Sequence, residues 1–272
     1  MRIAVTGAAG RVGHAVVQRA LADGHQVVSI DRTAPAASDA EPVILDLADF
    51  AALRTALDGC EALIHCAAIP GPGLLPDHVI HDNNVVASYH ALTAAAEVGI
   101  RRIVQASSVN AIGGRFSRMP RYDYFPVDEQ HPSYAEDAYS LSKWICEKQA
   151  FAISRRVDDM SIASLRLHAF VDDPVGLERW IGSPERIVER HLWGWTRREA
   201  AARAFLLGIT ADFDGHEVFD IVAPETMMEV PSVELAAEHY PEVPLRRDLP
   251  GRTGFFDCGK AETMLGWHHD ET

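Results

Sequence analysis

The chain has 272 residues, of which 47% are hydrophobic, and a formal net charge of -14 with a calculated pI near 5.3. This length and hydrophobic content suit one large α/β domain, alone or with a smaller appendage, and exclude a largely disordered chain. Because the surface carries so much negative charge, nucleic acid and anionic membranes are not expected as partners.

Apolar runs alternate with segments of helical periodicity in the first part of the chain. They predict strands at residues 2–7, 26–31, 42–47, 61–68 and 102–108, with helices at 11–24, 49–59 and 79–98. Strands that are apolar nearly throughout indicate a parallel sheet covered by helices on both faces.

A loop is expected next, at residues 120–132, because this segment is rich in proline and aromatic residues. Such loops over the carboxyl edge of a sheet usually carry substrate contacts. A helix at 135–155 contains the motif AYSLSK, and residues 161–167 and 215–222 predict two further strands. Elsewhere beyond Ala169 the pattern is irregular.

No apolar run approaches the roughly 18 residues needed to cross a bilayer, and the chain begins directly with a strand. The four cysteines form no CxxC pair, so free thiols in a reducing cytoplasm are expected. The closing HHD, residues 268–270, is interpreted as a frayed polar tail, and we expect no metal site.

Between the first strand and helix stands TGAAGRVG, with glycines at positions 7, 10 and 13. Such a turn needs positive φ and a backbone without a Cβ in the way of a pyrophosphate, which binds the amides that begin the helix. Asp31 ends the second strand, where a carboxylate can hold the adenosine ribose. The expected dinucleotide-binding residues here are Gly7, Ala9, Gly10, Arg11, Val12, Gly13, Asp31 and Arg32.

Asp31 also bears on the choice of dinucleotide. Its charge would repel the 2′-phosphate of NADP, which favours NAD, although the neighbouring Arg32 could recruit that phosphate. We therefore expect an α/β chain with a Rossmann-type, doubly wound parallel sheet. Residues 1–169 would form the NAD-binding domain, and residues 170–272 a small, partly interleaved substrate-binding lobe.

Several further motifs accompany the GxxGxxG spacing: DL at 46–47, HCAA at 65–68, ASS at 106–108, YSLSK at 139–143 and FFDCGKAETMLGW at 255–267. Together they resemble the extended short-chain dehydrogenase/reductase family, of the NAD-dependent epimerase/dehydratase type. The likeness covers nearly the whole chain. It implies a homodimer through the helices at 79–98 and 135–155.

The resemblance implies a catalytic set of Ser108, Tyr139 and Lys143. Tyr139 would be the general acid/base, and Lys143, one turn later on the same helical face, would promote its ionisation and hold the nicotinamide ribose. Ser108 would hydrogen-bond the reacting oxygen, with Ser107 as the nearby competitor. Without the glycine motif, the tyrosine and lysine would be read as a plain i, i+4 contact.

The same resemblance implies further cofactor contacts. Asp46 and Leu47 would flank the adenine, and Ala67 and Ala68 would line the path of the ribose and pyrophosphate. Asn84 would lie near the cofactor on the long helix.

The segment SSVNAIGG bears on the reaction. Val109 and Asn110 leave no acid where the family's dehydratases have one, and Ile112 stands where its epimerases tend to have tyrosine. His168 and Ala169 follow the strand where those epimerases carry an asparagine. Elimination chemistry and nucleotide-sugar binding are therefore disfavoured.

ASSVNAIG and ERHLWGW, the latter at 189–195, look like patterns of the hexuronate dehydrogenases, which oxidise a sugar acid to a lactone with NAD. Arg190 matches their carboxylate-binding arginine, since a guanidinium binds a carboxylate through two parallel hydrogen bonds. A surface ion pair explains Arg190 equally well. His168 is read either as pocket lining or as a core histidine, and Val109 and Asn110 replace polar substrate-contacting residues.

The sequence thus predicts an NAD-dependent oxidoreductase that oxidises a hydroxyl of a small sugar or sugar acid. A sugar epimerase is the enzymatic alternative. An NAD-binding, redox-sensing regulator is the alternative outside enzymes.

Overall fold

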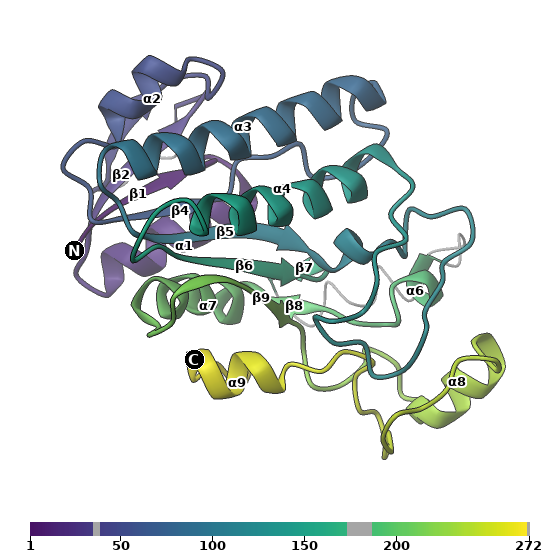
Figure 1. Ribbon diagram of the computed structural model, residues 1–272. Helices are drawn as coiled ribbons and strands as arrows, with labels where there is room; N and C mark the ends of the chain where they lie inside the picture. Colours follow the sequence, from purple (N-terminus) through teal and green to yellow (C-terminus); the bar gives the residue numbers. More distant parts are fainter. Residues whose placement is uncertain (35–38, 173–186, 271–272) are drawn as a thin grey trace.

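The computed structural model describes residues 1–34, 39–172 and 187–270. In these residues seven parallel strands form one sheet in the order β3-β2-β1-β4-β5-β6-β9 (Figure 1). The strands are β1 Arg2–Thr6, β2 Gln26–Asp31, β3 Glu41–Ile44, β4 Ala62–His65, β5 Arg102–Ser108, β6 Ser161–Leu167 and β9 Gly215–Ile221. The strand order reverses between β1 and β4, which is the switch point where doubly wound sheets bind ligands. The predicted Rossmann-type fold is confirmed.

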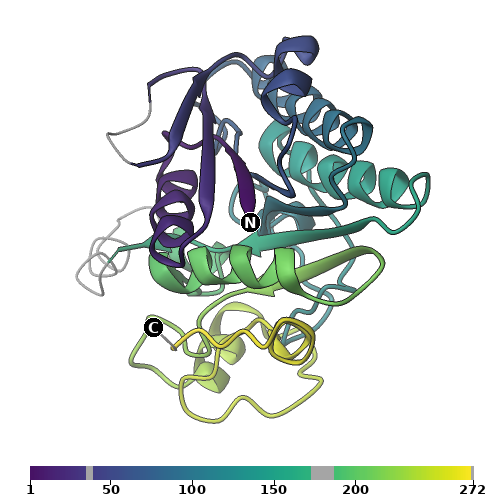
Figure 2. The same ribbon diagram turned by 90° about the vertical axis from the view of Figure 1, so that its left-hand side faces the viewer.

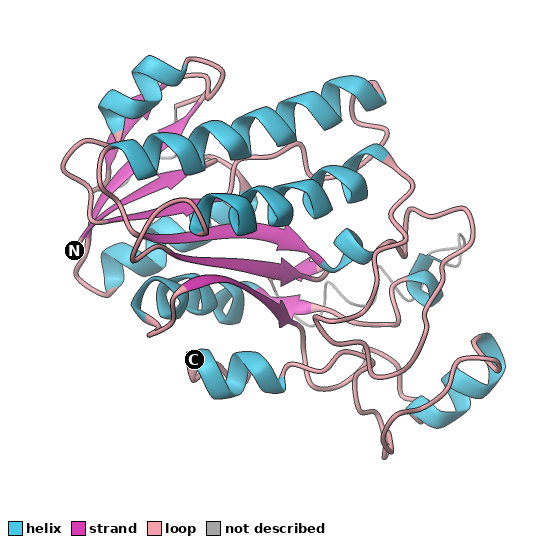
Figure 3. Cartoon of the chain, viewed as in Figure 1, coloured by secondary structure: helices cyan, strands magenta, loops and turns pink. Residues whose placement is uncertain are grey.

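Helices cover both faces of the sheet, as Figures 2 and 3 show. Alternate residues of β1 turn to opposite faces: Ile3 and Val5 belong to a core with α1 and α7, and Ala4 to a core with α2, α3 and α4. The bounds are α1 Arg11–Ala22, α2 Phe50–Ala56, α3 Asp77–Glu97, α4 Ala138–Ser154 and α7 Arg198–Thr210.

Beyond the carboxyl ends of the strands a third apolar cluster forms. Phe125 and Val127, in the segment predicted as a loop, pack there with Trp193 and Phe255, and the segment does form a loop. The shorter elements are η1 Val109–Ile112, β7 Phe170–Val171, α6 Ile187–Arg190, β8 Thr196–Arg197, α8 Ser232–His239 and α9 Gly259–Leu265. Since α7 and β9 belong to the main layers, the division at residue 169 stays a prediction.

Strands β3 and β4 end earlier than predicted from the sequence. Pairing ends at Ile44 in β3 and at His65 in β4, whereas the predictions reached residues 47 and 68. The remaining apolar residues of both runs line a cavity, so the apolar pattern continues where the sheet has stopped.

Helix α7 was not predicted from the sequence, and the C-terminal tail is more ordered than predicted. Helix α7 is buried over much of its surface, including Ala200, Ala201 and Ala202 in succession, so it lacks a narrow apolar stripe. The frayed tail is wrong for His269, which is buried, accepts a hydrogen bond from Arg197 N at 3.0 Å and packs on Trp195.

No helix among the described residues is long and apolar enough to cross a membrane. Helices α3 and α4 expose Tyr89 and Phe151. A homodimer through these helices and a cytoplasmic location both stay predictions.

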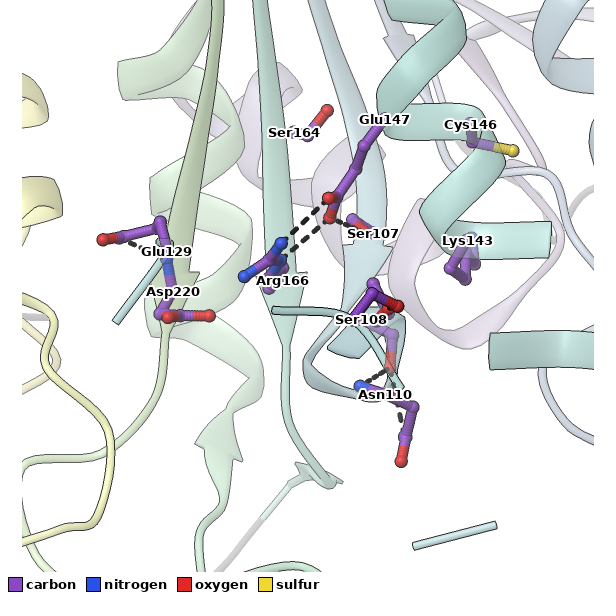
Figure 4. Close-up of polar contacts among 12 residues, drawn as sticks. Ser107, Ser108, Asn110, Glu129, Lys143, Cys146, Glu147, Ser164, Arg166 and Asp220 are labelled. Carbon is purple, nitrogen blue, oxygen red and sulfur yellow. Dashed lines mark hydrogen bonds and ion pairs between the residues drawn. The ribbon is translucent and has the colours of Figure 1, made fainter. Parts of the chain in front are cut away.

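A row of polar side chains crosses the buried centre of the sheet (Figure 4). Ser107, Arg166 and Asp220 are register neighbours on β5, β6 and β9. Above them, Glu147 of α4 accepts a hydrogen bond from Ser107 Oγ at 2.6 Å and two from Arg166, from Nε and Nη2, both at 2.9 Å. Glu129 of the 120–132 loop accepts one from Asp220 N at 2.9 Å.

The three acidic side chains of this row differ in the direction of their pKa shifts. Burial disfavours the charged form of Glu147, but the charge and hydrogen bonds of Arg166 more than offset it, so the pKa of Glu147 lies below its ordinary value. Burial raises the pKa of Asp220 well above its ordinary value, and it also raises that of Glu129. Glu147 and Arg166 are therefore the principal ion pair of the row.

Replacing Arg166 by methionine, Arg166→Met, should reduce the free energy of unfolding by about 3–5 kcal/mol, because it leaves the Glu147 carboxylate buried without its cation. Urea unfolding of the variant and the wild type measures this difference. Arg247→Met is the matched control: it breaks a half-exposed pair with Asp257 of 2.8 Å and should cost less than about 1 kcal/mol. Equal losses in both variants would contradict the prediction.

Candidate active site

The turn between β1 and α1 has no room for side chains at two of its glycines. Gly7 has φ +69°, and a Cβ there would lie 2.5 Å from Ala67 N. A Cβ on Gly13 would lie 2.1 Å from the carbonyl oxygen of Gly7. Gly10 begins α1 without any side-chain cap, so the first amides of the helix are left for an anion.

A cavity of about 530 Å³ opens on one side of this turn. Asp31 stands at its wall, where its carboxylate accepts hydrogen bonds from Ala9 N at 3.0 Å and Thr33 N at 3.2 Å. The predicted cofactor residues that line it are Gly7, Ala9, Gly10, Asp31, Arg32, Asp46, Leu47, Ala67 and Ala68. The expected adenosine contacts are thus brought together in one place.

A second cavity, of about 400 Å³, lies on the other side of the turn. Gly7, Gly10, Cys66 and Ala68 line both cavities, which are therefore two parts of one cleft. Predicted residues lining the second part are Arg11, Val12, Gly13, Ser108, Asn110, Tyr139, Lys143 and His168.

Helix α4 presents Tyr139 and Lys143 to this second part. Asp137 caps the helix by accepting hydrogen bonds from Tyr139 N at 3.0 Å and Ser140 N at 2.9 Å, which fixes Tyr139 in the first turn. Lys143 Nζ donates to Ala106 O at 2.6 Å and lies 5.9 Å from the centroid of the Tyr139 ring. The Lys143 ammonium therefore lies beside the Tyr139 ring.

The two serines that end β5 have different partners. Ser107 Oγ donates to Glu147, as described above. Ser108 Oγ accepts from Asn110 N at 3.1 Å and from Asn110 Nδ2 at 3.2 Å (Figure 4). As an acceptor in both contacts, Ser108 keeps its own proton to donate, which favours it over Ser107 for contact with a substrate oxygen.

Three predicted contact residues lie outside the lining of the cleft. Asn84 uses its side chain to hold Ile69 N at 2.8 Å and Ile69 O at 3.1 Å. Val109 packs in the third apolar cluster. Arg190 is exposed and donates to Ser117 O at 3.1 Å. Direct contacts by these three residues stay predictions.

His168 both lines the pocket and is a buried, hydrogen-bonded histidine, so both interpretations of this residue apply. It lines the second part of the cleft, yet its Nε2 lies 2.7 Å from His191 O and its Nδ1 accepts from Ala169 N at 2.6 Å. Burial lowers the pKa of His168 to about 4. The ring is therefore neutral at pH 7, with the proton assigned to Nε2.

Sequence reasoning missed Arg115, Phe116 and His191, which also line the second part of the cleft. The Phe116 ring meets that of Tyr139 edge-on, with centroids 5.9 Å apart. The glycine pair directly before Arg115 was the available signal, because it marks a tight turn shortly after Ser108.

Residues 3–171 match the family model described as the NAD dependent epimerase/dehydratase family. The chain belongs to this family. Its fold is that of the extended short-chain dehydrogenases/reductases, as predicted, and NAD is the cofactor of the family.

Two curated relatives of this epimerase/dehydratase chain are sugar dehydrogenases. The uronate dehydrogenase of Pseudomonas putida is 30% identical over 203 residues, 71% of each chain. The NAD-dependent glucose-6-phosphate dehydrogenase of Haloferax volcanii is 31% identical over 232 residues, 80% of this chain and 84% of that one. A match to an uncharacterized Mycobacterium tuberculosis protein, 39% identical over 110 residues, spans only 12% of that protein's length.

Among solved structures, MoeE5 in complex with UDP-glucose and NAD aligns over 100% of this chain and 94% of its own, with a TM-score of 0.75 and 22% identity. At this identity the likeness supports the fold alone.

The cleft fits the family's cofactor. The absent Cβ atoms at Gly7 and Gly13 let a pyrophosphate approach the backbone, and Asp31 can accept hydrogen bonds from a ribose. Within the described residues no cluster of three or more histidine, cysteine, aspartate or glutamate side chains could hold a metal ion. That the protein needs no metal stays a prediction.

Gly13→Ala should weaken NAD binding by about tenfold or more, because the new methyl group must push the Gly7 carbonyl out of the turn. Calorimetric titration with NAD measures the affinity, and thermal unfolding checks that the variant is folded. Gly71→Ala is the control, since its nearest neighbour would be Phe116 Cζ at 3.9 Å. A folded Gly13→Ala variant with unchanged affinity would contradict the assignment of this turn.

Proposed function

We propose that this chain is an NAD-dependent oxidoreductase that oxidises a hydroxyl group of a small sugar or sugar acid. One observation carries the proposal. Ser108, Tyr139 and Lys143 line the same 400 Å³ part of the cleft as the glycine turn that fits the pyrophosphate. The two sugar dehydrogenase relatives support the choice of substrate class.

In the proposed reaction the substrate hydroxyl lies between Ser108 and Tyr139. Ser108 donates a hydrogen bond to the reacting oxygen and so orients it. Tyr139 acts as the general base and accepts the hydroxyl proton, and Lys143 lies beside its ring. NAD would accept the hydride that leaves the carbon bearing this hydroxyl. Asn110 fixes the Ser108 oxygen through two contacts, which leaves the serine proton directed to the substrate.

Tyr139→Phe should keep NAD affinity and reduce kcat by about a hundredfold or more, because the ring packing remains while the proton acceptor is lost. NADH formation measured by absorbance gives kcat, and titration with NAD gives the affinity. Tyr89→Phe removes an exposed hydroxyl on α3 and should leave both unchanged. Substantial turnover by Tyr139→Phe would remove this residue from the mechanism.

Substrate class and cofactor choice are tested together by NADH or NADPH formation with a panel of free aldoses, uronic acids and UDP-sugars. We expect turnover with a free sugar or uronate, and with NAD in preference to NADP, because the Asp31 carboxylate at the ribose end repels a 2′-phosphate. Asp31→Ala should shift the preference toward NADP, since Arg32 lines the same cavity. If no free sugar gives NADH or NADPH, while the cofactor co-purifies with the protein and UDP-sugars are interconverted, the result would favour an epimerase instead.

A further inference from the structure

We infer that Phe116 is a positioning residue for Tyr139: its ring holds the phenol in the orientation in which the hydroxyl reaches a substrate oxygen beside Ser108. The inference rests on the proposed function and deepens it, because it assigns a task to a residue of the cleft that the mechanism does not use. Phe116 comes from the loop after η1, whereas Tyr139 is the second residue of α4.

The side chain of the proposed general base needs support beyond its own helix. The Asp137 cap fixes the backbone of Tyr139, but two side-chain torsions remain about which the ring can turn. The reacting hydroxyl lies at the far end of the ring, so even a modest rotation displaces it. A displacement of about 1 Å can lower the rate on the order of a hundredfold. Contacts along the ring therefore decide whether the base stays within hydrogen-bonding distance of its proton.

Tyr139 packs in a small apolar cluster to which Phe116 belongs. Its other members are Ile69, from the segment after β4, and Val79 and Ile80 of α3. Phe116 is the member that lines the second part of the cleft together with Tyr139. The two rings meet edge-on at 88°, with centroids 5.9 Å apart, which is a favourable geometry for an aromatic pair. Phe116 therefore completes the packing of the Tyr139 ring on the side of the cleft.

Phe116 is itself held in place by a tight turn. Ser117 N donates to Gly114 O at 2.9 Å, which makes a β-turn with Phe116 in its third position. Ser117 Oγ accepts from Gly114 N at 3.1 Å, and Ser117 O accepts from Arg190 Nη1 at 3.1 Å. The tip of the ring reaches the segment after β4, since a Cβ on Gly71 would lie 3.9 Å from Phe116 Cζ. The turn thus presents a ring whose own position is fixed.

The test is the kinetics of Phe116→Leu with the sugar that the substrate panel identifies and with NAD saturating. Leucine keeps an apolar contact but lacks the ring, so kcat should fall about tenfold or more, while KM for the sugar changes less than about threefold. NAD affinity, from calorimetric titration, should stay the same. Phe213→Leu is the matched control: it loses a similar ring contact, with Phe219 at 6.0 Å, outside the lining of the cleft, and should leave kcat unchanged.

A double variant separates positioning of Tyr139 from a general loss of structure. In the Tyr139→Phe background the hydroxyl is absent, so adding Phe116→Leu should lower the residual turnover by less than about twofold. An equally large loss of kcat in both backgrounds overturns the inference. So does a raised KM with unchanged kcat, which would make Phe116 a direct substrate contact.

Failure of the proposed function would be seen separately, as absence of turnover with every sugar in the wild type. The Tyr139 ring is then observed directly, by NMR relaxation of protein carrying ¹³C-labelled tyrosine. The chain has six tyrosines, so the resonance missing from Tyr139→Phe identifies the ring. Its motion should be greater in Phe116→Leu than in the wild type and in Phe213→Leu. Equal mobility of the Tyr139 ring in all three proteins overturns the inference.

Discussion

The ion pair between Glu147 and Arg166 is the interaction on which the geometry of the cleft depends. Glu147 lies one helical turn beyond Lys143, on the same face of α4, and Arg166 is the register neighbour of Ser107 on the adjacent strand. The pair therefore fixes α4, which carries the proposed general base Tyr139, against β5, which ends in Ser108. With Ser107 committed to Glu147, Ser108 is the serine of β5 whose proton remains for a substrate oxygen.

A buried ion pair is an expensive way to join a helix to a sheet, because apolar residues of similar volume often stabilise a fold equally well. The advantage of the ion pair over an apolar contact is that its hydrogen bonds have fixed directions. Two parallel hydrogen bonds from Arg166, and one from Ser107, allow Glu147 a single position, whereas an apolar contact tolerates sliding along the helix axis. The row continues to Asp220 and, through its backbone, to Glu129, which connects the sheet to the loop over its carboxyl edge.

The parts of the cleft that could be predicted from the sequence are those built from short stretches of chain. The glycine turn, Asp31 and the tyrosine–lysine pair are each set by spacing within one strand–turn–helix or one helix, and all of them line the cleft. Arg115 and Arg190 could not be separated in this way. Only the packed chain shows that one faces the cleft and the other holds Ser117 O from outside. Helix α7 was missed for a related reason, since burial on most sides erases the periodic pattern that marks a helix.

The two parts of the cleft are lined by different kinds of charged and polar groups. The first part, of about 530 Å³, is lined by Asp31, Arg32 and Asp46. It also borders the main chain of the glycine turn, which has no room for side chains at Gly7 and Gly13. The second part, of about 400 Å³, is lined by Lys143 and Arg115 and by two histidines, His168 and His191, whose pKa values burial lowers. Ser108, Asn110 and His168 come from segments other than the glycine turn, so these side chains can differ without disturbing the backbone at Gly7 and Gly13.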